Sequence, residues 1–223
     1  MFMRLLFALA GLTFAGAGIA ADAPWVEGKN YFSIDPAQPT STGDKIEVLE
    51  VFSFGCPACY QFNPFFKKIQ AALPKNAQIA YLPASFNPTE SWPTFQRGFY
   101  AAQALGIEDK SHDAAYNAVW GEKGPLSIHD AQTNKIVALS IEDLGKFYSA
   151  YGVKAEDFVA TANSFAVGTK MKRADAYVKA TGVDSTPTII VNGKYRVTGQ
   201  SAGDLDKLTA IVVYLVQKES AGH

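Results

Sequence analysis

Residues 46–59 read IEVLEVFSFGCPAC, and this pattern predicts a buried β-strand that leads directly into the start of a helix. Residues 46–52 are rich in β-branched and large apolar side chains, which favour a buried strand, and Glu50 is the unexpected polar residue among them. Cys56 and Pro57 then begin the helix, since proline is well tolerated in a first helical turn. The sequence therefore places a C-x-x-C motif at a helix N-terminus behind a buried strand.

Cys56 and Cys59 are the only cysteines in the 223 residues. A disulfide across so short a loop restrains the unfolded chain little, so an inert structural bridge is a poor explanation. At a helix N-terminus, free N–H groups and the helix dipole stabilise a thiolate, which is the nucleophile in disulfide exchange. We expect Cys56 to be the exposed, attacking thiol, and Cys59, one turn deeper, to be the buried thiol that resolves mixed disulfides.

The first residues have the pattern of an export signal. Arg4 supplies a positive charge, residues 5–19 are apolar or small, and small residues allow cleavage after Ala20 or after Ala23. We favour a signal peptide over residues 1–20. An uncleaved membrane anchor is the alternative, but the apolar stretch is short and contains several glycines. A short leader of this kind is typical of bacterial export, so the mature protein is predicted to be periplasmic.

The rest of the chain predicts an α/β protein with a mixed sheet flanked by helices. Strand patterns occur at residues 78–82, 188–191 and 195–198, and Asn192-Gly193 predicts a hairpin between the last two. Residues 88–163 have helical patterns without a strand signal, which indicates an inserted all-helical domain. We also expect a helix over residues 164–180 that stops at Gly182, a capping box from Ser201 to Asp204, and a closing amphipathic helix after it.

Other classes of function find little support in the composition. The 20 basic and 21 acidic residues nearly balance and form no basic stripe, so nucleic acid is not an expected partner. A zinc site built on the C-x-x-C motif would need two further ligands. His112, His129 and His223 are scattered without ligand spacing, so we expect no metal and no cofactor. His112 and His129 are predicted to be ordinary surface or domain-interface residues.

Three features in this order resemble the DsbA-type disulfide oxidoreductases of the thioredoxin superfamily. They are FSFGCPACY after a strand, the helical insertion, and Thr186-Pro187 before a late strand, and the resemblance extends from about Trp25 to Val216. It implies a thioredoxin-like domain in two parts, residues 21–87 and 164–223, around the insertion at 88–163. It also implies an enzyme that introduces disulfide bonds into exported proteins by dithiol–disulfide exchange.

The same resemblance implies roles for residues outside the motif. Pro187 should follow a cis peptide bond and face the cysteines, so that the backbone of Thr186 can hydrogen-bond an extended substrate peptide. Glu50 stands six residues before Cys56, where the family has a buried acid that relays a proton to or from the second cysteine. The alternatives are a trans proline that begins an edge strand and an edge glutamate that reaches water.

The chain departs from the family pattern at three places. Ala58 stands where well-studied members have a histidine that stabilises the thiolate, so we expect a higher Cys56 pKa than in those members and a milder oxidant. The stretch Ala80-Tyr81-Leu82 lacks the lysine that often pairs with the buried acid. Thr186 replaces a typical valine, and threonine is commoner there in disulfide isomerases.

The partners implied by the resemblance are reduced or unfolded exported proteins and a DsbB-like membrane oxidase. A periplasmic isomerase or reductase is the main alternative. DsbC-type isomerases carry an N-terminal dimerisation domain, for which residues 21–45 are too few, so we expect a monomer. A peptide-binding chaperone with an inert disulfide is opposed by the intact cysteine pair, and a glutathione-dependent isomerase is opposed by the export leader.

Overall fold

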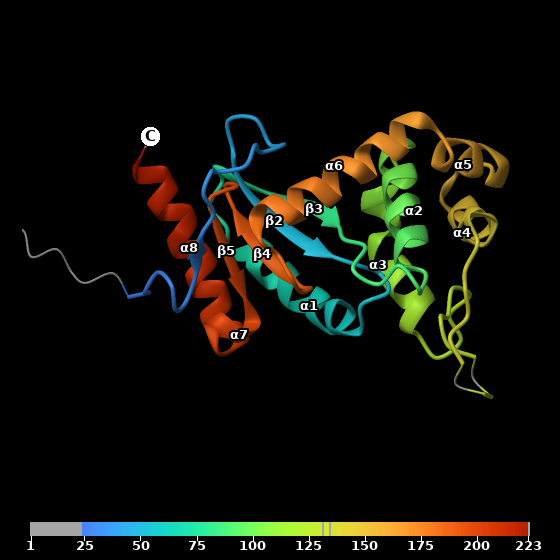
Figure 1. The fold of residues 1–223 in the computed structure, drawn as a ribbon, viewed down its shortest axis with the longest axis horizontal. Helices are drawn as coiled ribbons and strands as arrows, with labels where there is room; N and C mark the ends of the chain where they lie inside the picture. Colours follow the sequence, from blue (N-terminus) through green and yellow to red (C-terminus); the bar gives the residue numbers. More distant parts are fainter. Residues whose placement is uncertain (1–23, 131, 134, 223) are drawn as a thin grey trace, which may run out of the picture.

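A computed structural model describes residues 24–130, 132–133 and 135–222 of the chain (Figure 1). The predicted leader, its two cleavage positions and His223 lie outside the described residues. Within these residues, five strands form one mixed sheet in the order β1-β5-β4-β2-β3, in which β2 runs parallel to β3 and antiparallel to β4. The strands are β1 (Phe32–Ser33), β2 (Ile46–Phe52), β3 (Ala77–Pro83), β4 (Thr188–Val191) and β5 (Tyr195–Thr198). The predicted α/β class and the mixed sheet are therefore confirmed.

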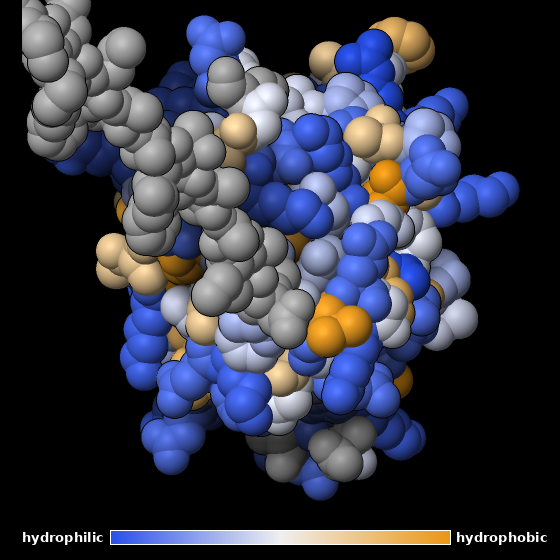
Figure 2. Space-filling model, turned by 90° about the vertical axis from the view of Figure 1, so that its left-hand side faces the viewer, coloured by the Kyte–Doolittle hydropathy of each residue, from blue (hydrophilic) through white to orange (hydrophobic). Residues whose placement is uncertain are grey.

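Helices cover both faces of this sheet. Successive residues of a strand point to opposite faces, so Val48 packs with α1 (Pro57–Ala72) and α8 (Leu205–Ala221), whereas Val51 packs with α6 (Phe165–Thr181). Glu50 has the same parity as Val48 and thus points toward the face that α1 covers. The surface on the α8 side is mostly hydrophilic with scattered apolar residues, because α8 turns its apolar side inward (Figure 2).

The segment between β3 and α6 is helical, as predicted. It contains α2 (Trp92–Ala104), α3 (Glu108–Trp120), α4 (Ile141–Tyr148), a short 3₁₀ turn (Ser149–Tyr151) and α5 (Ala155–Ala162). In Figure 1 the sheet lies between α8 and this insertion. α6 packs against α2 and α5 as well as against the sheet, so it joins the two parts of the molecule. The domain boundaries at residues 87 and 163 stay a prediction.

Local signals explain several of the element ends. Asn192 and Gly193 both have positive φ, at 51° and 65°, which forms the predicted tight turn between β4 and β5. A side chain at Gly193 would collide with the backbone of Gln38. Gly182 ends α6 in the left-handed conformation, with φ at 63°, as expected.

The predicted capping box from Ser201 to Asp204 is wrong. Ser201 instead completes a capping box with Thr198 at the start of the short helix α7 (Gly199–Ala202). Asp204 caps α8 by accepting a hydrogen bond from the Lys207 N–H group. The physical reason is a break at Gly203, whose φ of 90° separates the two helices and gives each its own N-terminus.

Candidate active site

Cys56 is the N-cap residue of α1, and Pro57 occupies the first turn behind it. Cys56 and Cys59 are both free thiols, and the Cys59 N–H group donates a hydrogen bond to the Cys56 sulfur at 3.3 Å. The prediction that Cys56 is exposed is wrong, since only 4% of its surface is accessible. It is covered because buried Gly55 precedes it and the Thr186 carbonyl lies 3.5 Å from its sulfur.

The two thiols differ strongly in acidity. The hydrogen bond with the Cys59 side chain lowers the pKa of Cys56 to about 6, and the backbone N–H groups of Cys59 and Ala58 add to this effect against the cost of burial. Burial raises the pKa of Cys59 far above its ordinary value, and the neighbouring Cys56 sulfur and Glu50 carboxyl raise it further. At neutral pH the pair is therefore a thiolate at Cys56 beside a protonated thiol at Cys59.

Glu50 lies beneath this pair, in the middle of the sheet. β2 is flanked by β3 and β4, so the residue is not on an edge strand, and its side chain has no accessible surface. Within the described part of the chain, neither carboxylate oxygen has a hydrogen-bond partner. Burial raises the pKa of Glu50 well above its usual range. The alternative of an edge glutamate that reaches water is therefore excluded.

Thr186 and Pro187 lie against the cysteine pair, 130 residues further along the chain. The peptide bond between them is cis, as predicted, and the trans alternative is excluded. When Cys56 is protonated, its thiol donates a hydrogen bond to the Thr186 carbonyl. The structure thus brings Cys56, Cys59, Ala58, Thr186 and Pro187 together at one end of the sheet.

A cavity of about 790 Å³ opens beside Ala58 and Pro187. Apolar side chains of α1 and α8 form part of its wall, and Phe65 and Leu205 are among them. The sequence pattern did not single out Phe65 as a site residue. Ala58, Phe62 and Phe65 follow helical spacing from the motif itself, so this periodicity is the signal that could have identified the wall of the cavity.

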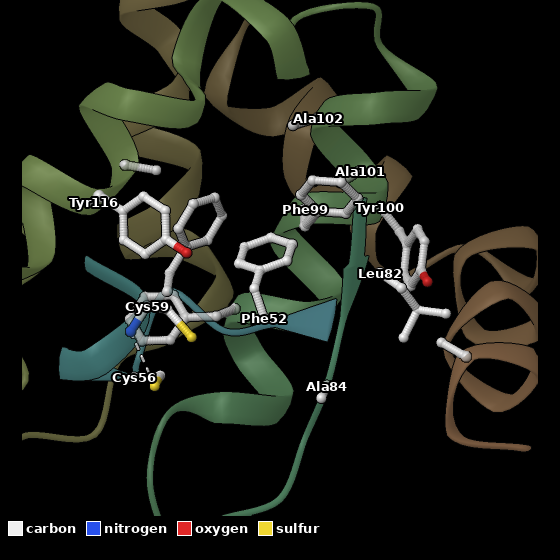
Figure 3. Packing of buried hydrophobic residues seen from close by; sticks show 14 of the residues in the cluster. Phe52, Cys56, Cys59, Leu82, Ala84, Phe99, Tyr100, Ala101, Ala102 and Tyr116 are labelled. Atoms are coloured by element: carbon white, nitrogen blue, oxygen red, sulfur yellow. Dashed lines mark hydrogen bonds between the residues drawn. The ribbon is translucent and has the colours of Figure 1, made fainter. Parts of the chain in front are cut away.

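The helical insertion contacts the motif through aromatic rings on α3. Trp120 donates a hydrogen bond from its indole nitrogen to the Phe54 carbonyl at 2.8 Å, and the Tyr116 ring lies 5.0 Å from the Phe54 ring. Figure 3 shows Tyr116 and Phe52 in the same hydrophobic cluster as the two cysteines. His112, on the same helix, is buried at this interface.

The described ranges contain neither a group of metal-ligating side chains nor a helix suited to cross a membrane. Among residues 24–130, 132–133 and 135–222, no three histidine, cysteine or acidic side chains are grouped to hold a metal ion. No helix in that part of the chain combines the length and apolar character needed to cross a membrane.

Comparisons with known proteins agree with this geometry. Residues 47–210 match the family model of the DSBA-like thioredoxin domain. The chain is similar to a thiol:disulfide interchange protein DsbA of Pseudomonas aeruginosa, with 34% identity over 98% of both chains. It is also similar to the crystal structure of the oxidoreductase DsbA from Xylella fastidiosa, with a TM-score of 0.76, 34% identity, and coverage of 89% of this chain and 99% of that one. A crystal structure of P. aeruginosa DsbA gives a TM-score of 0.74 at 32% identity, over 89% of this chain and 96% of that one.

Proposed function

The chain belongs to the family of DSBA-like thioredoxin domains and is a dithiol–disulfide oxidoreductase, and on that premise we propose that it introduces disulfide bonds into exported proteins through Cys56 and Cys59. The observation that carries the proposal is the difference in acidity between the two thiols. A Cys56 pKa of about 6 makes its thiolate a good leaving group and favours the reduced form of the protein. A protein whose reduced form is stabilised in this way passes its disulfide to other proteins.

The oxidised protein reacts in two exchange steps. A substrate thiolate attacks the Cys56 sulfur, the bond between Cys56 and Cys59 breaks, and Cys59 leaves with the electron pair. A second substrate thiolate then attacks the substrate sulfur of the mixed disulfide and releases Cys56 as a thiolate. Because the Cys59 pKa is raised far above neutrality, Cys59 must take up a proton in the first step. Buried Glu50, whose pKa is also raised, is the proposed donor of that proton.

The substrate peptide is proposed to bind in extended form beside Cys56. The Thr186 backbone, in contact with the Cys56 sulfur, offers hydrogen-bonding groups of the kind that an added strand uses. The adjoining cavity of about 790 Å³, with its partly apolar wall, can receive substrate side chains next to the reacting sulfur. These features suit unfolded or reduced protein chains.

The cellular setting is proposed from the sequence. The leader pattern of residues 1–20 supports export to the periplasm, where disulfide bonds form and persist. A DsbB-like membrane oxidase would return the Cys56–Cys59 pair to the disulfide, and the protein would act as a monomer. A periplasmic isomerase is the second candidate, and Thr186 is the one residue that favours it.

A reduced model protein with one native disulfide tests the proposal. Equimolar oxidised protein should convert its two thiols into the disulfide while the Cys56–Cys59 pair becomes reduced. Absence of transfer would contradict the proposal. If the protein instead restored the native disulfides of a scrambled model protein but did not oxidise a reduced one, the result would favour the isomerase.

Replacing Ala58 by histidine should make the protein more oxidising. A histidine at this position places a partial or full positive charge beside the Cys56 sulfur, and an opposite charge at such a distance lowers a pKa by about one pH unit or more. We expect the Cys56 pKa to fall below its value of about 6. Ultraviolet titration of the thiolate in the reduced variant gives the pKa, and an unchanged value would show that Ala58 does not set the strength of this oxidant.

A further inference from the structure

Three buried polar side chains around β2 have no hydrogen-bond partner among the described residues. They are Glu50, with both carboxylate oxygens, His112, with both ring nitrogens, and Tyr116, with its hydroxyl group. Buried polar groups in native proteins are nearly always hydrogen-bonded, so each exception asks for an explanation. His112 and Tyr116 are one turn apart on α3 and belong to the insertion, whereas Glu50 belongs to the sheet.

The three side chains are close neighbours. Tyr81 is paired with Glu50 in the parallel register of β2 and β3, so the two side chains point to the same face of the sheet. The His112 ring lies 4.3 Å from the Tyr81 ring and 5.5 Å from the Tyr116 ring. The Phe52 ring lies 5.2 Å from the His112 ring and 6.1 Å from the Tyr116 ring, and Figure 3 shows Phe52 and Tyr116 in the same cluster. His112 thus contacts the rings of Tyr81 and Tyr116, and the charge of Glu50 acts on both of these phenols.

A polar cleft lies on the other side of His112. It has a volume of about 630 Å³, and both Tyr81 and His112 line it. Exposed Lys67 and Asp113 form an ion pair at the cleft, and the Glu108 carboxylate lies 3.5 Å from Nδ1 of His112. His112 and Tyr81 therefore connect the buried surroundings of Glu50 with a cleft that has charged and exposed walls.

We propose that His112 passes protons between water in this cleft and Glu50, by way of the phenols of Tyr81 and Tyr116. This proposal rests on the proposed exchange at Cys56 and Cys59. His112 does not touch the sulfur atoms and is a positioning and relay residue that acts through Glu50. The titratable and charged groups that face it are Glu108, Asp113 and Tyr116 on α3, Tyr81 on β3, Glu50 on β2 and Lys67 on α1.

The protons balance through one exchange. When the bond between Cys56 and Cys59 breaks, Cys59 receives the electron pair and takes the proton of the Glu50 carboxyl. Glu50 regains a proton from a neighbouring phenol of Tyr81 or Tyr116, that phenol takes one from the His112 ring, and His112 takes one from water in the cleft. When the protein is reoxidised, the Cys59 thiol gives its proton to the Glu50 carboxylate, and the same path returns it to water. Without a relay, each transfer would have to wait for the buried carboxyl to meet solvent.

Substituting His112 with glutamine, H112Q, tests the relay. The rates of reduction by dithiothreitol and of reoxidation by glutathione disulfide are measured from pH 5 to 8 in water and in deuterium oxide. A group that transfers protons directly contributes a factor of about 10² or more, so for a relay through Glu50 we expect both rates to fall about tenfold. The solvent isotope effect should rise, and the equilibrium constant with glutathione should stay unchanged, because a relay speeds both directions equally.

Substituting His129 with glutamine is the matched control. His129 is exposed, its ring is tilted against that of Trp120 at 6.2 Å, and it does not line the cleft beside His112, so its loss should change neither rate. If H112Q does not fold, His112→Phe keeps a ring in the aromatic cluster and should show the same loss of rate.

Two results would overturn the relay. One is an H112Q or His112→Phe protein with wild-type rates at every pH. The other is an equilibrium constant that moves together with one of the two rates, since His112 would then act on the stability of a redox form. One assay uses a small dithiol and the other a small disulfide, so they report on the relay independently of whether the wild-type protein oxidises a reduced protein, which is the separate test of the proposed function.

Discussion

The Cys59→Ala protein is expected to accumulate as a covalent complex with its substrates. Cys56 keeps its place at the N-terminus of α1 and can still attack a substrate disulfide, but the thiol that resolves the mixed disulfide is gone. Non-reducing electrophoresis should show adducts that a reducing agent removes. The Cys56→Ala protein should form no adducts and transfer no disulfide, because Cys59 has no accessible surface for a substrate to reach.

The structure adds a second result for the same position. The hydrogen bond with the Cys59 side chain is the largest cause of the low Cys56 pKa, so Cys59→Ala should raise that pKa above about 6. Cys59→Ser is the matched control, since its hydroxyl group can still donate a hydrogen bond to the Cys56 sulfur. Both variants should trap substrates, but only the alanine variant should raise the Cys56 pKa, by about one pH unit or more. Multiple-turnover transfer by either variant would refute the assignment of Cys59 as the resolving thiol.

Replacing Glu50 by leucine should stabilise the fold and slow the redox reaction. The Glu50 carboxyl is fully buried and has no partner among the residues described, and such a group costs about 1–3 kcal/mol. A leucine of similar size removes that cost, so the free energy of unfolding should rise by about 1–3 kcal/mol at pH 7. Urea unfolding measures the gain. Reduction by dithiothreitol should slow by about tenfold or more, because Cys59 loses its proton donor.

The stability of the wild-type protein should also depend on pH through Glu50. Burial raises its pKa above the ordinary value near 4.5, so the unfolded chain loses this proton at a lower pH than the folded protein does. The contribution is fully present below pH 4.5 and is lost as pH rises toward the folded pKa, at about 1.4 kcal/mol for each pH unit. The Glu50→Leu protein should lack this decline, and an unchanged slope would contradict the buried, protonated carboxyl.

Glu47 offers a matched control on the same strand. Its side chain is also buried, but its carboxylate accepts hydrogen bonds from the backbone N–H and the hydroxyl of Ser41, at 2.7 and 2.6 Å. Glu47→Leu should therefore destabilise the fold by about 1–3 kcal/mol, the opposite sign to Glu50→Leu, because the Ser41 groups lose a charged partner. It should leave the redox rates unchanged, since Glu47 points to the opposite face of the sheet from Glu50.

The elements around the motif could be predicted because their signals are local. A stretch rich in β-branched and large apolar residues gives β2, Pro57 gives the start of α1, and the Asn192-Gly193 pair gives the hairpin. The contact between Cys56 and Thr186 joins positions 130 residues apart, and only the resemblance to a family could suggest it. Residues with a local backbone preference were thus predictable from their own neighbours.

Features that depend on packing between distant segments could not be predicted from the sequence. The low exposure of Cys56 results from the Thr186 segment, and the burial of His112 results from the docking of α3 against Phe52 and Tyr81. Helical periodicity can indicate the apolar side of α1, but it cannot show that Phe65 borders a cavity. Each of these properties is set by a neighbour whose position follows from the whole fold.

The reduction potential of the Cys56–Cys59 pair tests the central claim most directly. The reduced and oxidised forms are equilibrated in glutathione buffers at pH 7, and their fractions are followed until the midpoint is defined. A Cys56 thiolate stabilised to a pKa of about 6 should make the protein more oxidising than thioredoxin, whose potential is about −270 mV. A potential at or below that of thioredoxin would contradict a disulfide donor and indicate a reductase.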